Sequence, residues 1–339
     1  MKKNEIKKID SERYLALLEN FPEQIKQGIE IGKKIKLKKR KFENIIVHGM
    51  GGSGITGKIL ECLFENELKI PIQTNKDYNI PEFVSKNTLF IAVSYSGATE
   101  ETLQGTRKAK EKKAFILGIS SGKKFSDECN YLIKIPEGYP PRAASAFLVI
   151  PLIFALEKLG LIKSKEKQIQ EFIKLAETEK KDIENKAKDT AKKLFKKQIF
   201  VYSTQSIGIS SFRWMTQINE NSKDFCHANV LPELNHNEIN MKYKKGVFVF
   251  LKTNNESTQM KKRISFTKKV FSKHNKIIEF TTKGQALFCK LFYVIYLGDF
   301  VSYYLALLNK VDPYPVPVIN ELKKELKLKE NYKLRYEYI

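Results

Sequence analysis

A glycine-rich loop between an apolar strand and a helix constrains this chain more than any other feature of its sequence. Residues 49–54 read Gly-Met-Gly-Gly-Ser-Gly and follow the apolar run Ile45–Val47. Glycines let a backbone come close to a ligand, and the unpaired N–H groups and the dipole at the start of the next helix favour negative charge. Ser53 adds a hydroxyl donor at the same place. The loop therefore predicts a binding site for an anion.

The same glycines permit a second interpretation. Gly49, Gly51 and Gly54 satisfy the G-x-G-x-x-G pattern of dinucleotide-binding proteins. That pattern expects an Asp or Glu at the end of the next strand to hold a ribose, but the run 69–75 ends without one and Asp77 lies further out. An NAD-dependent enzyme is therefore the weaker alternative. A tight turn that binds nothing is a third interpretation, which the density of glycine and serine disfavours.

Apolar strands alternate with helices through the first part of the chain. The expected strands cover 45–47, 88–93, 114–119 and 131–135, and a loop containing serine or glycine follows each of them. Continuous apolar strands between helices are typical of a parallel sheet that helices cover on both faces. Ligands of such sheets bind at the carboxyl ends of the strands, which is where these loops fall.

The alternation begins again after a charge-rich helical stretch. The second set comprises strands at 198–202, 246–251 and 276–280, with helices at 207–222, 257–272 and 285–310. We therefore expect a repeat of two α/β units within one chain. The predicted parts are an N-terminal segment of one or two amphipathic helices at 1–40, a first domain at 41–160, a helical connector at 161–197, and a second domain with a C-terminal helix at 198–339.

Composition excludes several classes of partner. The net charge is +23, yet the lysines are scattered over nearly every expected helix without a nucleic-acid reader motif, so we expect a solvated basic surface and no nucleic acid. The apolar run Ala286–Leu308 is interrupted by Lys290 and Asp299, which favours a buried helix and no membrane span. Four cysteines far apart and the lack of a secretory signal favour the cytoplasm, without disulfides.

A second loop at the carboxyl end of a strand is rich in hydroxyl groups. Ser94, Ser96 and Thr99 lie within six residues, and Thr99 stands where a helix cap is expected, before Glu100 and Glu101. Capping needs only one hydroxyl. The surplus suits the acceptor oxygens of a phosphate, so this loop predicts a phosphate site beside the glycine loop.

The two loops together resemble the sugar isomerase (SIS) domain, which binds phosphosugars. Six segments, in the same order, resemble more closely the bifunctional phosphoglucose/phosphomannose isomerases: Gly49–Gly54, Ser94–Gly97, Pro141–Ala144, Asn219–Asn221, His236-Asn237 and Ile319–Lys323. The resemblance extends from about 44 to 326. It implies an α/β fold with two parallel-sheet SIS subdomains, each a flavodoxin-like three-layer αβα unit. It also implies an aldose–ketose isomerase that interconverts glucose 6-phosphate and mannose 6-phosphate with fructose 6-phosphate through an enediol.

The resemblance also assigns roles to particular residues. It makes Glu220 the proton-transfer base, His236 the group that opens the sugar ring, Arg142 the cation beside the enediolate, and Lys323 an assisting lysine near the ring. The phosphate-binding set that it implies is Gly52, Ser53, Ser94, Ser96 and Thr99. Without the resemblance, Glu220 would be a solvated helix-end glutamate and Arg142 a surface arginine after two prolines.

Other histidines and one lysine are alternatives to these assignments. His227 lies close to His236 in sequence, and Lys324 lies beside Lys323. We expect His48 to pack in the core and His274 to lie at the surface. The cysteines and histidines lack metal-ligand spacing, so we expect no metal and no cofactor.

The resemblance implies a homodimer whose active site takes Glu220 from one chain and His236 from the other, although a loop within one chain would also serve. The expected substrates are sugar 6-phosphates. Two departures from the family make glucose 6-phosphate a better supported substrate than mannose 6-phosphate: Ala98 replaces a frequent asparagine, and the segment 314–317 lacks a frequent threonine. A non-catalytic phosphosugar sensor is the alternative from another class, and it would need neither Glu220 nor His236.

Overall fold

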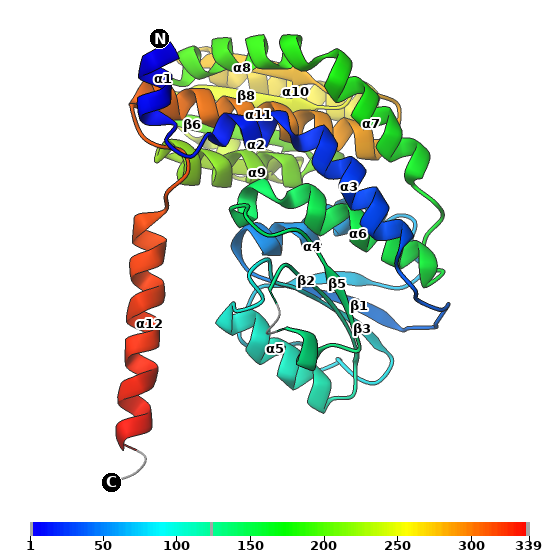
Figure 1. Ribbon diagram of the computed structural model, residues 1–339. Coiled ribbons are helices and arrows are strands. Elements are labelled where there is room, and N and C mark those ends of the chain that lie inside the picture. Colours follow the sequence, from blue (N-terminus) through cyan, green and yellow to red (C-terminus); the bar gives the residue numbers. More distant parts are fainter. Residues whose placement is uncertain (1–2, 123–124, 337–339) are drawn as a thin grey trace.

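The first half of the chain forms a five-stranded parallel sheet in the computed structural model, which describes residues 3–122 and 125–336 (Figure 1). The strands lie in the order β2-β1-β3-β4-β5, and each neighbouring pair is parallel. Their bounds are β1 Asn44–His48, β2 Ile72–Asn75, β3 Thr88–Val93, β4 Phe115–Ser120 and β5 Tyr131–Lys134. All five carboxyl ends therefore lie along one edge, where the two predicted anion loops follow β1 and β3.

Helices cover both faces of this sheet. They are α3 Phe21–Lys33, α4 Gly51–Phe64, α5 Glu100–Glu111 and α6 Ser145–Lys158, with short 3-10 turns η1 Ser126–Glu128 and η2 Pro141–Ala143. Ile45 and Val47 of β1 face a large core shared with α4 and α6, whereas Ile46 and Phe90 face a smaller core on the side of α5. This alternation is the period of two expected of a strand that is buried on both faces.

The second half forms a four-stranded parallel sheet in the order β7-β6-β8-β9. The strands are β6 Ile199–Thr204, β7 Cys226–Leu231, β8 Val247–Lys252 and β9 Lys276–Thr281. Sequence analysis missed β7, because its sequence Cys-His-Ala-Asn-Val-Leu is not a continuous apolar run. The predicted α/β class with two parallel-sheet units is otherwise confirmed.

The helices of the second half replace the single long helix expected at 207–222 by three shorter pieces. These are η3 Gln205–Ile207, α9 Ile209–Gln217 and the π-helical turn η4 Ile218–Ser222. The remaining helices are α7 Glu166–Thr178, α8 Lys180–Leu194, η5 Glu233–His236, η6 Glu238–Asn240, α10 Thr258–Ser272 and α11 Leu287–Asn309. A π-helical turn needs one extra residue per turn, and such turns occur often at functional sites.

One large core joins the two halves. It contains side chains of both sheets, of α3, α4, α6 and of the connector helices α7 and α8, with α11 at its centre. By length and composition α11 could cross a membrane, but 94% of its most apolar window is buried inside the protein. The prediction of a buried helix is thus confirmed, and its all-round apolar surface is explained by this burial.

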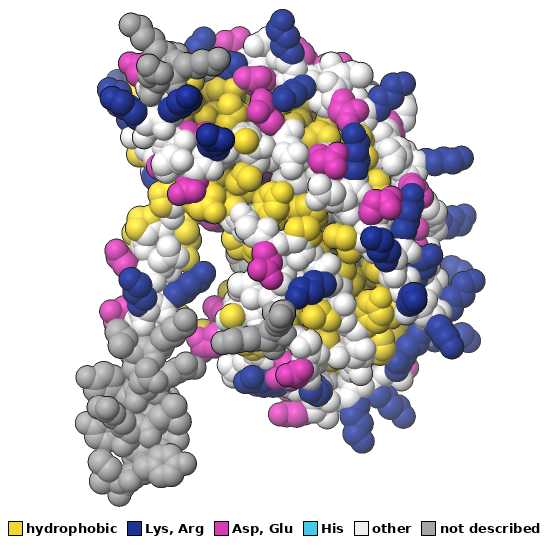
Figure 2. Space-filling model, viewed as in Figure 1, with side chains coloured by type: hydrophobic (Ala, Val, Ile, Leu, Met, Phe, Trp, Pro, Cys, Tyr) yellow, Lys and Arg dark blue, Asp and Glu magenta, His cyan; other side chains and the backbone are white. Residues whose placement is uncertain are grey.

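The two ends of the chain differ from the body. Instead of one or two helices, the N-terminal segment has three, which are α1 Lys3–Ile9, α2 Tyr14–Glu19 and α3. The C-terminal helix α12, Pro317–Tyr336, projects away from both sheets (Figure 1). Figure 2 shows Lys and Arg side chains on the visible face, most of them toward its right-hand edge.

Candidate active site

The glycine loop lies directly against the segment that carries Arg142. Gly51 starts α4 with a φ of +52°, a conformation that favours glycine. A Cβ on Gly52 would lie 2.9 Å from the backbone nitrogen of Arg142, so a larger residue would push the two segments apart. Ser53 is buried, and its Oγ accepts a hydrogen bond of 3.1 Å from the N–H of Tyr95. The hydroxyl of Ser53 therefore ties the first loop to the second.

The second loop holds its hydroxyl groups at the carboxyl end of β3. Ser94 is buried and donates to Thr99 Oγ1 at 3.1 Å, whereas Ser96 is exposed and accepts from the N–H of Ala98 at 3.3 Å. Thr99 does occupy the N-cap position of α5, but its side chain makes no capping bond. The expected cap is therefore wrong in this respect, because the hydroxyl of Thr99 turns to Ser94.

Arg142 is a buried residue and not a surface one. Its side chain is 3% exposed, and its Nη1 lies 3.7 Å from Glu220 Oε2. Its Nε donates to Asn221 Oδ1 at 2.7 Å, and its Nη2 donates to the carbonyl oxygens of Pro313 and Tyr314, each at 2.7 Å. Three fixed acceptors hold the planar guanidinium, so its remaining edge points to Glu220.

The π-helical turn η4 places Glu220 beside two cations. The side chain of Glu220 is 28% exposed. The Nζ of Lys223 donates to the backbone carbonyl of Glu220 and, at 2.8 Å, to that of Pro315. Loss of solvation, and then the charge of Arg142, lowers the pKa of Lys223. A carboxylate that remains open to solvent next to Arg142 can exchange a proton with a bound substrate.

A buried network below Arg142 was not predicted from the sequence. Arg213 and Asp299 form a buried ion pair, with Nε–Oδ1 at 3.2 Å and Nη2–Oδ2 at 3.1 Å. Arg213 Nη2 also donates to the backbone carbonyl of Arg142 at 2.6 Å. Asn221 Nδ2 donates to Ser302 Oγ on α11 at 2.9 Å. These contacts fix Arg142 from the second half of the chain. Of the four residues Arg213, Asp299, Asn221 and Ser302, only Asn221 could be linked to the site from the sequence, because it lies next to Glu220 in a segment that matches the family.

His236 and Lys323 lie apart from this cluster. His236 is exposed at the end of η5, just after the carboxyl end of β7, whereas Glu220 precedes the amino end of the same strand. The whole of β7 and the start of η5 therefore lie between Glu220 and His236 along the chain. Lys323 is an exposed residue of α12. The structure therefore brings Arg142, Glu220 and the two loops together, but not His236.

The other three histidines lie outside the candidate site, either in contact with other residues or at the surface. His48 is buried between the side chain of Asn75 and the backbone carbonyl of Glu101, and burial lowers its pKa. His227 Nε2 lies 2.8 Å from Glu238 Oε1. His274 is exposed. The predictions of a core His48 and a surface His274 are confirmed.

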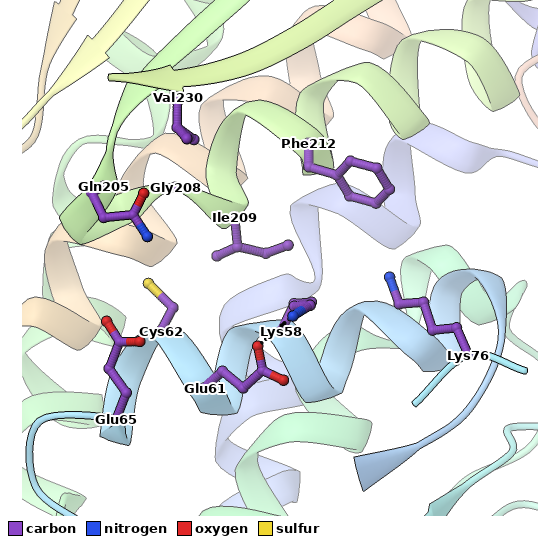
Figure 3. Close-up of a pocket in the computed structure, with 10 residues that line it drawn as sticks. All are labelled: Lys58, Glu61, Cys62, Glu65, Lys76, Gln205, Gly208, Ile209, Phe212 and Val230. Atoms are coloured by element: carbon purple, nitrogen blue, oxygen red, sulfur yellow. Dashed lines mark hydrogen bonds and ion pairs between the residues drawn. The ribbon is translucent and has the colours of Figure 1, made fainter. Parts of the chain in front are cut away.

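A pocket of about 380 Å³ lies between α4 and α9, away from the candidate site (Figure 3). Glu61, Cys62 and Glu65 line it from the far end of α4, and Ile209 and Phe212 line it from the start of α9. None of the predicted site residues lines this pocket. The candidate active site instead comprises the starts of α4 and α5, Arg142 and the turn that carries Glu220.

Family models match both halves of the chain. A model described as the SIS domain matches residues 36–157, and one described as the bacterial phospho-glucose isomerase C-terminal SIS domain matches residues 183–326. The chain is 39% identical over 331 residues to the bifunctional phosphoglucose/phosphomannose isomerase of Caldicellulosiruptor bescii, which covers 91% of this chain and 97% of that relative. It is 34% identical over 309 residues to the protein of the same name from Thermoplasma volcanium, covering 89% and 97%.

Solved structures show the same fold. The C-terminal domain of glucosamine-fructose-6-phosphate aminotransferase from Francisella tularensis matches with a TM-score of 0.74 and 18% identity, covering 89% of this chain and 97% of that one. A likeness at this level of identity concerns the fold alone.

Proposed function

The chain belongs to the bifunctional phosphoglucose/phosphomannose isomerase family, and from this premise we propose that it interconverts glucose 6-phosphate and mannose 6-phosphate with fructose 6-phosphate. The observation that carries the proposal is the buried guanidinium of Arg142, held 3.7 Å from the carboxylate of Glu220. A non-catalytic phosphosugar sensor would need no such pair. In this proposal the glycine loop binds the phosphosugar and not a dinucleotide, in line with the SIS model that matches residues 36–157.

The proposed chemistry is a proton transfer between neighbouring carbons. Glu220 removes the proton from C2 of the open-chain aldose phosphate, which leaves an enediolate with its negative charge on oxygen. A proton also moves from O2 to O1 of the enediolate, and the same carboxylic acid then returns its proton to C1, which gives the ketose with no atom gained or lost. Arg142 stabilises the charge that develops on oxygen, because its guanidinium is already fixed before the substrate binds.

The proposed phosphate site combines the two loops. Ser94, Ser96 and Thr99 supply hydroxyl groups at the start of α5, and Gly52 and Ser53 close the site from the glycine loop. Because Ser53 Oγ accepts from Tyr95, its own hydroxyl hydrogen can be donated to the phosphate. A metal-free reaction, a cytoplasmic location and domain boundaries at 41–160 and 198–339 belong to the same proposal.

We also propose that the active site is completed across a homodimer. Two observations support this: His236 is exposed, and β7 separates it from Glu220 of its own chain. A ring-opening histidine must reach the sugar that Glu220 deprotonates, so the histidine at this site comes from the second chain. Lys323 assists near the sugar ring in this proposal.

A coupled assay with glucose 6-phosphate, mannose 6-phosphate and fructose 6-phosphate, in the presence of EDTA, tests the activity. We expect turnover of all three. Turnover of none of them would contradict the isomerase assignment, and loss of activity with EDTA that added zinc restores would contradict the metal-free reaction.

A further inference from the structure

The C-terminal helix carries an apolar stripe that its own chain leaves open. Val318, Ile319, Leu322 and Leu326 are 74%, 40%, 57% and 38% exposed. At about 100° per residue these four side chains fall within roughly 100° of the helix surface, which is the width of a packing face. Figure 2 shows apolar atoms on the first turns of α12, with a gap between this helix and the first sheet domain.

The start of α12 is fixed at the candidate active site. Arg142 binds the carbonyl oxygens of Pro313 and Tyr314, and Lys223 binds that of Pro315. These contacts hold the segment that leads into the helix at Pro317. The same two side chains that flank Glu220 therefore hold the residues just before α12, and the stripe begins close to the candidate active site.

A second copy of the chain has to come to this point if the shared active site is correct. The proposed dimer places His236 of the partner subunit at Glu220, and Glu220 contacts both side chains that hold the start of α12. The first turns of α12 then lie next to the partner. We propose that the apolar stripe packs on this second copy, so that the two chains exchange their α12 helices reciprocally; this rests on the proposed shared site.

The region around His236 offers an apolar surface for such a helix. Asn235 donates to Thr267 Oγ1 at 2.7 Å, and Arg263 lies within hydrogen-bond distance of Asn235, so the loop that carries His236 is held on α10. Phe266, in the same turn of α10, is 61% exposed. A large exposed aromatic side chain on the helix that holds the His236 loop is a suitable contact for an apolar stripe.

Two matched variants test the exchange. Ile319→Glu with Leu322→Glu adds two negative charges on the stripe, and Asn320→Glu with Lys324→Gln makes the same change in net charge on the opposite face. All four substitutions keep residues that are compatible with a helix. Sedimentation equilibrium over a dilution series gives the dissociation constant of each dimer, and circular dichroism verifies the fold.

We expect the stripe variant to raise the dissociation constant by roughly 100-fold or more, because two buried aliphatic side chains are lost from each interface helix. The opposite-face variant should match the wild type. An unchanged dissociation constant in the stripe variant would overturn the exchange of α12. If complementation between chains succeeds while the stripe variant still dimerises normally, the shared site stands and only the role of α12 fails.

Discussion

Arg142 contacts two separate parts of the chain through one guanidinium, the turn η4 and the segment that precedes α12. Its Nε reaches Asn221, its Nη2 reaches Pro313 and Tyr314, and its Nη1 faces Glu220. Hydrogen bonds to a charged group contribute about 1.5–3 kcal/mol each, and a buried guanidinium without acceptors would be unfavourable. The network therefore sets the position of Arg142 before any substrate binds.

Asn221→Ala should lower kcat by roughly 10-fold to 100-fold, because it removes the acceptor of Arg142 Nε while the phosphate loops stay intact. Asn219→Ala in the same π-helical turn is the control, since Asn219 is exposed and its Nδ2 donates to the carbonyl of Asp224 instead. Steady-state kinetics of both variants should show a small change in KM.

A double-mutant cycle separates positioning from general stability. Arg142→Lys has no Nε donor, so Asn221→Ala should add little to the loss of activity in that background. If the two losses multiply in full, Asn221 does not act through Arg142.

Glu220→Gln keeps the shape of the side chain and removes its basicity. The isomerisation should slow by roughly 10²-fold or more, while binding of the phosphosugar is retained. Single-turnover kinetics and equilibrium binding measure the two effects separately. Glu177→Gln, an exposed glutamate paired with Lys26, should leave both unchanged. Near-normal turnover of the Glu220 variant would remove its role as the base.

Sequence alone could identify some of these residues and not others. Glu220 and Arg142 stand in short segments that match a family, so their identity could be predicted. The burial of Arg142 could not, because it depends on Asn221 and on carbonyl oxygens from Pro313 and Tyr314 that follow far along the chain. A backbone carbonyl gives no sequence signal, because every residue has one.

At the level of elements, the two anion loops could be predicted from the sequence, because their glycines and hydroxyl groups follow apolar strands. The turn that carries Glu220 was not, since a π-helical turn has no sequence pattern that distinguishes it from the end of an α-helix. The strand β7 was hidden by His227 and Asn229, two polar side chains in a short edge strand. Because β7 was not predicted, it was also not apparent that a strand lies between Glu220 and His236 along the chain.

The second loop should determine phosphate affinity. Ser96→Ala combined with Thr99→Ala should raise KM far more than it lowers kcat, because phosphate contacts are made equally in the ground state and the transition state. The matching position after β8 provides a control. Ser257 caps α10 by accepting from the N–H of Met260, so Ser257→Ala should cost about 1 kcal/mol of folding stability without a change in KM. An unchanged KM for fructose 6-phosphate in the double variant would exclude the phosphate assignment.

For the whole molecule, the candidate active site lies where the two halves of the chain meet. Arg142 comes from the first half and Glu220 from the second, and Arg213 with Asp299 holds the backbone of Arg142 from within the second half. One continuous core joins both sheets around α11. The repeat was visible in the sequence as two rounds of strand and helix, but how the halves pack depends on contacts between residues distant in sequence, which no local pattern encodes.

Mixing two inactive variants tests the central claim most directly. Glu220→Gln chains and His236→Ala chains are prepared separately, unfolded and refolded together, and size analysis confirms that mixed dimers formed. If each site combines Glu220 of one chain with His236 of the other, every mixed dimer has one site with both groups intact, and the mixture should regain substantial isomerase activity. If both groups act within one chain, every site keeps a defect and the mixture stays as inactive as its two components, which would contradict the account.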